Sequence, residues 1–354
     1  MLSLWCNKKT KTMITVTQSI PATCFSANIP DVEFSIGGYR AAVVMTVDGE
    51  EIYNERLYPV GGKIQLCELD CLLGPYARQS LKIALGIKIV EQTDSSDAAD
   101  TKTISADIIY SAADIGMGAA DFMALREGEK VTALNRLEYL HFIGTEAAKV
   151  TAEYDDGSTK AFDAVVVAGN DKYTTIDVSA DKFVAEGKVL VCYDVQAGAR
   201  SFRFTIDFDE PDCAPILVFV NSFGVEELLY CTGTHSVAPT YKRDSGYIGR
   251  YNRNYNIVET RAFKADTGIM PFAMANWADE LLRSQEVHVV NFKDGHANVG
   301  KEVTITDSKS EYSNDDDELP RFTFTYQYAQ RNHNVVDVLR SGRIFDNTFD
   351  NTFE

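Results

Sequence analysis

Alternating apolar and polar residues dominate the chain. Residues 40–60, RAAVVMTVDGEEIYNERLYPV, read as a strand, an Asp48-Gly49 turn and a second strand. Asp-Gly supplies the left-handed backbone positions that a tight hairpin needs. Residues 82–92, KIALGIKIVEQ, continue the same alternation. The pattern predicts antiparallel β-structure from the start of the chain.

Further hairpins are predicted around Asp156-Gly157 and Gly198, and an Asn-Ser-Phe-Gly corner at 221–224 separates two apolar runs. Short strands with turn residues between them are typical of sandwiches and barrels. We therefore expect a mainly β protein with two or more antiparallel sandwich-like or barrel-like domains. One helix is predicted at about 271–284, where apolar residues recur at helical spacing after Pro271.

Composition shifts suggest where the domains begin and end. Residues 93–103 are polar and nearly free of large apolar groups, which indicates a linker or a long loop. The expected parts are a disordered leader at 1–12, an N-terminal β-domain at 13–92, the linker at 93–103, a central β-domain at 104–235, a C-terminal β-rich domain at 236–336, and a mobile tail or exchange arm at 337–354.

The charge balance narrows the classes of partner. The formal net charge is −18 and the pI is about 4.7. Such a surface repels phosphate backbones and anionic lipid, so neither nucleic acid nor membrane is an expected partner. No apolar window is long enough to span a bilayer. The first residues lack the form of a secretory signal, and the seven cysteines lie mostly in apolar strand contexts, so we expect reduced thiols and synthesis in a cytoplasm.

Catalytic and metal-binding motifs are not recognisable. The acidic run Asp315–Glu318 lacks the spacing of an EF-hand loop and is interpreted as a solvated turn ended by Pro320, with a non-standard calcium loop as the alternative. The histidines are scattered without metal-ligand spacing. Neither a G-x-S-x-G elbow nor a phosphate-binding loop is present. We expect no cofactor, no metal and no enzymatic activity.

The stretch 241–265, YKRDSGYIGRYNRNYNIVETRAFKA, combines basic and aromatic residues. It holds six basic residues against two acidic ones, with four tyrosines between them. Stacking on single-stranded nucleic acid or sugar is one interpretation, and an exposed loop before a short strand is another. Tyrosine and arginine are also enriched at protein interfaces, and an acidic identical copy would complement a basic arm. The hypothesis is a self-assembling subunit with interface residues Tyr241, Arg243, Tyr247, Arg250, Tyr251, Arg253, Tyr255 and Arg261.

The last residues repeat Asp-Asn-Thr-Phe. We expect Phe345, Phe349 and Phe353 to anchor this tail in a groove on a neighbouring subunit, by strand addition or aromatic insertion.

The segments RAFKADTGIMPFAMANWADELLRSQEVHVV and GKEVTITDSKSEYSNDDDELPRFTFTYQYAQRNHNV resemble the C-terminal part of uncharacterised structural proteins of Bacteroidetes phages and prophages. The segment VFVNSFGVEELLYCTG is similar to the asparagine-to-glycine corner in the same proteins. The resemblance covers roughly residues 215–335 and transfers no active-site residue. It implies a tail or baseplate component of a virion, assembled in the host cytoplasm with copies of itself and other tail proteins. The alternative is a carbohydrate-binding or adhesion module that contacts a host-surface glycan. For that alternative, Trp277 is expected in the core, and Trp5 lies in the leader.

Overall fold

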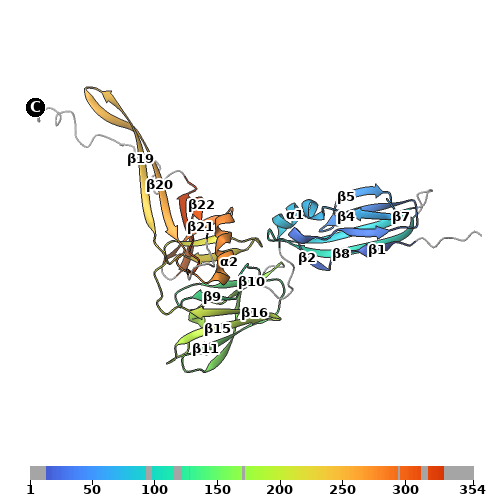
Figure 1. Cartoon of the computed structure of the whole chain (residues 1–354), viewed down its shortest axis with the longest axis horizontal. Coiled ribbons are helices and arrows are strands. Elements are labelled where there is room, and N and C mark those ends of the chain that lie inside the picture. The colour runs from blue at the N-terminus through green and yellow to red at the C-terminus, as the bar shows by residue number, and fades with distance from the viewer. Residues whose placement is uncertain are drawn as a thin grey trace, which may run out of the picture. The chain divides into compact units, whose positions relative to one another are not determined.

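The computed structural model describes residues 13–92, 98–114, 122–126, 128–169, 172–293, 296–311 and 318–330 (Figure 1). The fold is mainly β, with most strands paired antiparallel in open sheets. The chain divides into two compact units. The first holds residues 1–208 and 220–227, and the second holds 209–219 and 228–354.

The first unit begins with a β-sandwich. One sheet has the order β2-β8-β7-β4-β5 and the other the order β1-β3-β6. The strands are β1 Thr15–Gln18, β2 Thr23–Phe25, β3 Val32–Ser35, β4 Arg40–Val47, β5 Glu50–Leu57, β6 Lys63–Leu66, β7 Lys82–Gln92 and β8 Ala98–Ile109. A short 3₁₀ turn, Ser26–Asn28, follows β2.

Alternation along these strands builds the core of the sandwich. In β4 every second residue is buried, including Val43 and Met45, and these face Phe34 of the opposite sheet in one apolar cluster. The hairpin between β4 and β5 turns at Asp48 and Gly49, both with positive φ, which confirms the predicted turn.

The structure has a second helix, α1 Leu69–Ser80, whereas the sequence pattern predicts only one helix. Leu69, Leu73 and Ala77 are its buried residues, spaced four apart and part of the sandwich core. Gly74 and Pro75 lie in its middle, and this pair is the usual signature of a turn. Burial of the apolar stripe outweighs the hydrogen bond that Pro75 removes.

The expected linker at 93–103 is wrong for the described residues 98–103. These residues belong to β8, which pairs with β7 along its length, for example Thr103 with Lys88 and Thr101 with Val90. Residues 93–97 lie outside the described part. The stretch looks like a loop in sequence because Thr101, Lys102 and Thr103 are exposed, whereas the ladder is made by the backbone.

A second sandwich completes the first unit. Its sheets have the orders β12-β11-β15-β16-β9 and β10-β14-β13, around a core that includes Phe142, Tyr193 and Phe204. The hairpins predicted around Asp156-Gly157 and Gly198 are both confirmed. The strands are β9 Glu129–Thr132, β10 Tyr139–Phe142, β11 Ala148–Tyr154, β12 Thr159–Asp163, β13 Val165–Gly169, β14 Thr174–Asp177, β15 Leu190–Ala197 and β16 Arg200–Ile206, with a 3₁₀ turn at Ala180–Phe183.

The second unit contains most of a seven-stranded sheet in the order β18-β17-β21-β22-β23-β20-β19, while Val220 at the end of β17 and Glu226 and Glu227 at the start of β18 fall in the first unit. Its strands are β17 Ile216–Val220, β18 Glu226–Tyr230, β19 Ser236–Ile248, β20 Tyr251–Asp266, β21 Val287–Lys293, β22 His296–Lys309 and β23 Thr323–Tyr328. The expected boundary at 235/236 differs from this division. The reason is a long-range pairing of β17 with β21, which local pattern does not reveal.

Helix α2, Phe272–Arg283, confirms the predicted helix. Pro271 precedes its first residue, and the buried stripe includes Trp277 and Leu281. Trp277 is 1% exposed, and its ring centroid lies 6.2 Å from that of Phe219 on β17. The tryptophan is therefore a core residue of the second unit, as expected from its place in the stripe.

Candidate interaction surface and a buried polar cluster

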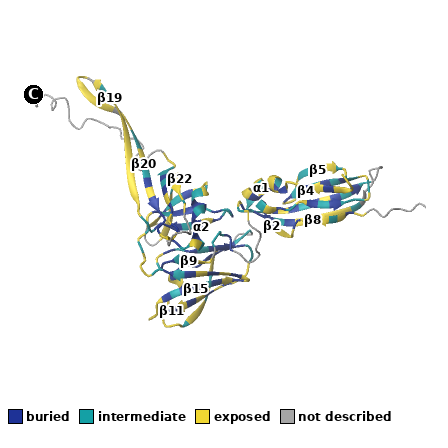
Figure 2. Cartoon of the chain, viewed as in Figure 1, coloured by how far each residue is buried: buried dark blue, intermediate teal, exposed yellow. Residues whose placement is uncertain are grey.

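Strands β19 and β20 form a long hairpin, which we call the ribbon (residues 236–266; Figure 1). The two strands pair from Ser236–Lys264 to Ile248–Tyr251. Strand β20 also pairs with β23, but only from Phe263 to Asp266. Residues 237–262, the distal ribbon, therefore have strand partners only within the hairpin among the described strands. Most of their side chains are exposed (Figure 2).

The predicted interface residues lie on this ribbon but divide between its two faces. Paired residues of an antiparallel ladder share a face, and successive residues alternate. Tyr241 pairs with Glu259, Arg243 with Ile257 and Pro239 with Arg261, which brings Tyr241, Arg243 and Arg261 together. Alternation along β19 adds Tyr247 to the same face.

Tyr251 and Arg253 lie on the other face. They pair with Ile248 and Gly246, beyond a register shift between Asp244 and Ser245. Arg250 forms the turn together with Gly249, and both residues have positive φ. The side chain of Tyr255 is outside what the structure describes, as are Phe345 and Phe349.

Each basic face is organised by local contacts. The Arg243 guanidinium lies 5.1 Å from the Tyr241 ring centroid, and that of Arg253 lies 5.8 Å from the Tyr251 ring centroid. Arg261 forms an ion pair with Glu259 at 2.6 Å, and this hydrogen bond raises the pKa of Arg261. These cation–π contacts fix each arginine side chain against its tyrosine ring and leave the solvent-facing side of the pair accessible to a partner.

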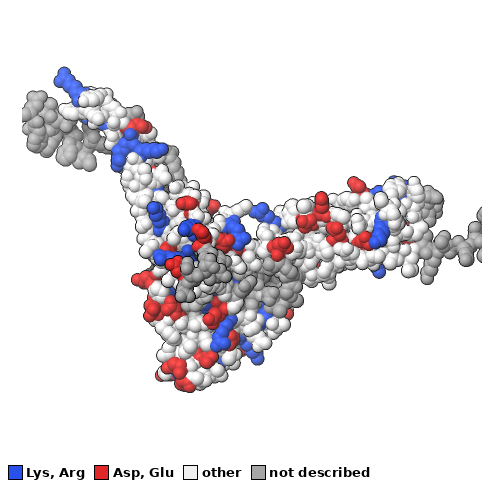
Figure 3. Space-filling model, viewed as in Figure 1, with Lys and Arg blue, Asp and Glu red and all other residues white. Residues whose placement is uncertain are grey.

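The ribbon is an exposed, basic and aromatic surface. Tyr247 is 83% exposed and Tyr251 is 66% exposed. Lys and Arg side chains outnumber Asp and Glu along it in Figure 3, in agreement with six basic and two acidic residues between 241 and 265. A two-stranded ribbon open on both faces is marginally stable by itself, which favours a surface that is covered in use.

A polar groove of about 360 Å³ lies at the base of the ribbon, on the second unit. Cross-strand pairs place Lys264 beside Ser236 and Thr325. Lys309 pairs with Thr323, which lies two residues before Thr325 on β23. Asp266, which also lines the groove, is already paired with Arg321. The groove has hydroxyl and amine donors but is open, so its chemistry alone does not define a ligand.

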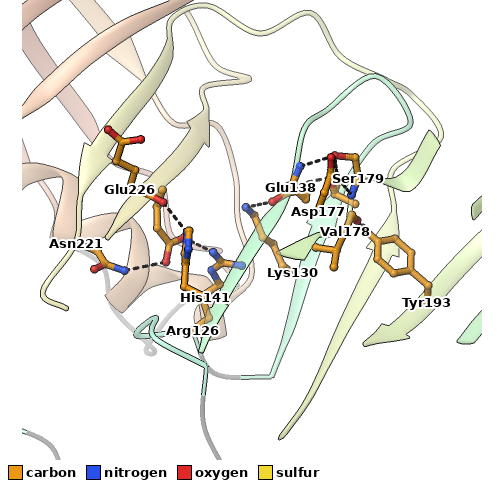
Figure 4. Close-up of polar contacts among 12 residues, drawn as sticks. Arg126, Lys130, Glu138, His141, Asp177, Val178, Ser179, Tyr193, Asn221 and Glu226 are labelled. Atoms are coloured by element: carbon orange, nitrogen blue, oxygen red, sulfur yellow. Dashed lines mark hydrogen bonds and ion pairs between the residues drawn. The ribbon is translucent and has the colours of Figure 1, made fainter. Parts of the chain in front are cut away.

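The first unit contains a buried polar cluster that the sequence analysis did not identify (Figure 4). Arg126, in the segment before β9, forms an ion pair with Glu227 of β18, and their side chains are 3% and 1% exposed. On β9, Lys130 binds Glu138 at 2.6 Å, and the Thr132 hydroxyl donates to the same carboxylate at 2.9 Å.

The charges of this cluster shift one another's pKa values. Burial lowers the pKa of Lys130, and the Glu138 carboxylate opposes this only in part. Burial alone would raise the pKa of Glu227, but Arg126 and Lys130 outweigh it, so that pKa lies below its usual range. The cluster therefore buries two acid–base pairs, Arg126 with Glu227 and Lys130 with Glu138, away from water.

His141 on β10 is the neutral member of the cluster. Burial lowers its pKa. Its Nε2 lies 2.9 Å from the Glu226 carbonyl oxygen, and its Nδ1 lies 2.9 Å from the Thr175 hydroxyl. A carbonyl only accepts, so Nε2 carries the proton and Nδ1 accepts from Thr175.

The cluster holds the corner Asn221–Val225 in place. The Asn221 amide donates to the Met123 carbonyl and to Glu227, at 2.9 and 3.0 Å, and its oxygen accepts from the Phe223 backbone N–H at 2.9 Å. Phe223 and Val225 pack with Phe25, Ile109 and Met123 in a separate apolar cluster. Because these side chains are buried, they position the corner and do not form a surface that a ligand reaches.

The described residues contain no group of three or more His, Cys, Asp or Glu side chains arranged to hold a metal ion. Of the predicted acidic run, Asp315–Asp317 lie outside the described part and Glu318 is exposed. Strand β23 follows Pro320, as expected. In the part of the chain that the structure describes, no helix has the length and apolar character needed to cross a bilayer.

No family model matches the chain, and no curated protein does. Among solved structures, the crystal structure of Rst D1-D2 matches with a TM-score of 0.27 and 8% identity, covering 55% of this chain and 98% of that one. A three-Ig fragment of titin, domains I67–I69, matches with a TM-score of 0.21 and 11% identity, covering 72% and 92%. At these scores the likeness supports no argument about function.

Proposed function

We propose that this protein is a non-enzymatic structural subunit of a phage tail or baseplate, which assembles with copies of itself through the ribbon. The observation that carries the proposal is the distal ribbon: a basic, tyrosine-rich hairpin, open on both faces, on a chain of net charge −18. The resemblance of residues 215–335 to phage structural proteins supports the setting. Other tail proteins are the remaining partners in this proposal.

The two faces of the ribbon favour a contact in which a neighbouring subunit packs against both of them. Tyr247 on one face and Tyr251 on the other are both large, rigid and exposed, which is the character of interface anchors. The basic surface complements the acidic remainder of a neighbouring copy, so the contact joins two different surfaces. Contacts of that kind close into rings when the rotation between neighbours allows.

Charge reversal on the ribbon tests the proposal. Arg243→Glu combined with Arg253→Glu changes both faces while leaving the turn residue Arg250 untouched. Arg56→Glu combined with Lys88→Glu makes the same charge change at exposed positions of the first sandwich. We expect the ribbon variant to stay folded but to lose the wild-type oligomer mass in light scattering, and the control to keep the wild-type mass. An unchanged mass for the ribbon variant would reject the proposed contact.

A carbohydrate-binding module remains the second candidate, and one observation favours it. Tyr39 and Tyr58 are both more than half exposed, with ring centroids 5.4 Å apart and planes at 81°. Exposed aromatic rings can stack on sugars, although the buried Trp277 is unavailable for this. A glycan-binding module acts as a monomer, so the same mass measurement separates the two candidates.

A further inference from the structure

Strand β13, Val165–Gly169, is an unusual edge. It is the last strand of the order β10-β14-β13, so β14 is its only strand neighbour among the described residues. Val165, Val166 and Val167 are 56%, 55% and 54% exposed. Regular alternation would bury every second residue, but the register shifts between Val166 and Ala168, which accounts for three consecutive exposed valines.

The other edge strands in the described ranges are protected. Strand β5 exposes glutamates, β12 exposes Lys160 and Asp163, and β19 contains Pro239 and exposes Lys242. Strands β1, β2, β6, β9 and β18 each expose a polar or charged residue as well, and β10 exposes none of its side chains. Charges and prolines on edges are how proteins prevent strand pairing between molecules. The β13 edge has no such protection, which points to a surface that is paired in use.

We propose that the β13 edge pairs with the β13 edge of a second copy of this chain, antiparallel across a two-fold axis. Pairing would join the two three-stranded sheets into one continuous sheet and bury the valines of both copies. This interface is separate from the ribbon contact and goes beyond the proposed function.

Charge argues for an identical partner. Two copies of a chain of net charge −18 repel each other over most of their surfaces, and a charged edge placed against itself would add like charges at close range. Residues 164–169, AVVVAG, carry no charge, so this strand faces its own copy without that cost. Two-fold contacts use the same patch on both subunits, which requires such self-complementarity.

The test combines mass with hydrogen exchange on the full-length protein. Val165→Lys with Val167→Lys places charges on the edge, and Val184→Lys with Val189→Lys makes the same change at exposed valines of the same sandwich, outside β13. With the ribbon contact removed by Arg243→Glu and Arg253→Glu, the backbone amides of 165–169 should become protected as concentration raises the mass twofold, both without further changes and with the control pair. In the edge variant the dimer dissociation constant should rise roughly tenfold or more, and this protection should disappear.

Three results would overturn the proposal. Protection of β13 at concentrations where the protein is monomeric would place a segment of the same chain, such as residues 331–354, on the edge. A doubled mass without protection of β13 would place the dimer contact elsewhere. Absence of association at every concentration would show that β13 does not pair with a second copy of the chain. The Arg243→Glu, Arg253→Glu variant keeps the β13 edge, so failure of the ribbon contact is measured separately.

Discussion

Two buried residues, Arg126 and Glu227, connect chain segments that are 101 residues apart in sequence. Their ion pair, together with the Asn221 amide, fixes the corner between β17 and β18 against the segment before β9. A buried pair of this kind contributes less to stability than its geometry suggests, because both ions lose their hydration. Removing one partner is different, since it leaves a charge buried without compensation.

We expect Arg126→Met to lower the free energy of unfolding by about 3–5 kcal/mol, measured by urea denaturation. The double change Arg126→Met with Glu227→Leu should restore most of that loss, because neither charge remains. Arg203→Met, which breaks an exposed pair with Glu153, should cost less than about 1 kcal/mol. If Arg126→Met and Arg203→Met lower the free energy of unfolding equally, removing one partner of the buried pair costs no more than removing one partner of an exposed pair.

His141 makes stability depend on pH. Its folded-state pKa is lowered by burial, so the unfolded chain binds a proton at higher pH than the native protein does. Stability is therefore full above the ordinary histidine pKa and falls as pH drops below about 6.5, by at most about 1.4 kcal/mol per pH unit. Urea denaturation between pH 8 and pH 5 should show a shallower slope for His141→Gln, whereas His296→Gln, at an exposed position, should retain the wild-type slope.

At the scale of elements, the ribbon differs from the rest of its sheet. Residues 263–266 of β20 pair with β23, and Phe263 and Lys264 pair with β19 as well, whereas the distal ribbon is paired only with itself. Fewer long-range contacts mean a lower free energy of local opening. We expect the amides of 240–260 to exchange faster than those of 263–266 in the monomer and to slow on assembly. Equal exchange in both states would mean that the ribbon is not covered.

Which elements can be predicted from sequence depends on whether their pattern is local. The hairpins at Asp48-Gly49, Asp156-Gly157 and Gly198 follow from residues within each turn, and α2 follows from its apolar stripe. Helix α1 was missed because Gly74-Pro75 resembles a turn. Strand β8 was missed at its start because its side chains there are exposed and polar.

The ribbon and the buried polar cluster also differ in how far local sequence predicts them. The basic and aromatic composition of the ribbon is visible in one stretch of sequence, but its division into two faces depends on the register of β19 and β20. The buried cluster draws on Arg126, Glu138, His141, Asn221 and Glu227, which only tertiary pairing brings together. A usable signal was present: Glu138 and His141 are polar residues within an apolar strand segment, where burial requires partners.

At the scale of the whole molecule, the two proposed contacts respond to salt in opposite ways. The ribbon contact depends on attraction between a basic hairpin and an acidic copy, over distances that salt screens. The β13 contact buries uncharged valines between copies that repel each other, so screening removes the repulsion and leaves the apolar contact intact. Raising ionic strength should therefore weaken the first contact and strengthen the second.

Light scattering at about 0.05 M and about 0.5 M salt measures this difference, because the Debye length falls from roughly 14 to 4 Å over that range. The Val165→Lys, Val167→Lys variant retains only the ribbon contact, and its oligomers should dissociate as salt rises. The Arg243→Glu, Arg253→Glu variant retains only the β13 contact, and its dimer should persist or tighten. If both variants respond to salt alike, the assignment of an electrostatic and an apolar interface to these two surfaces is wrong, because charge would then govern both contacts or neither.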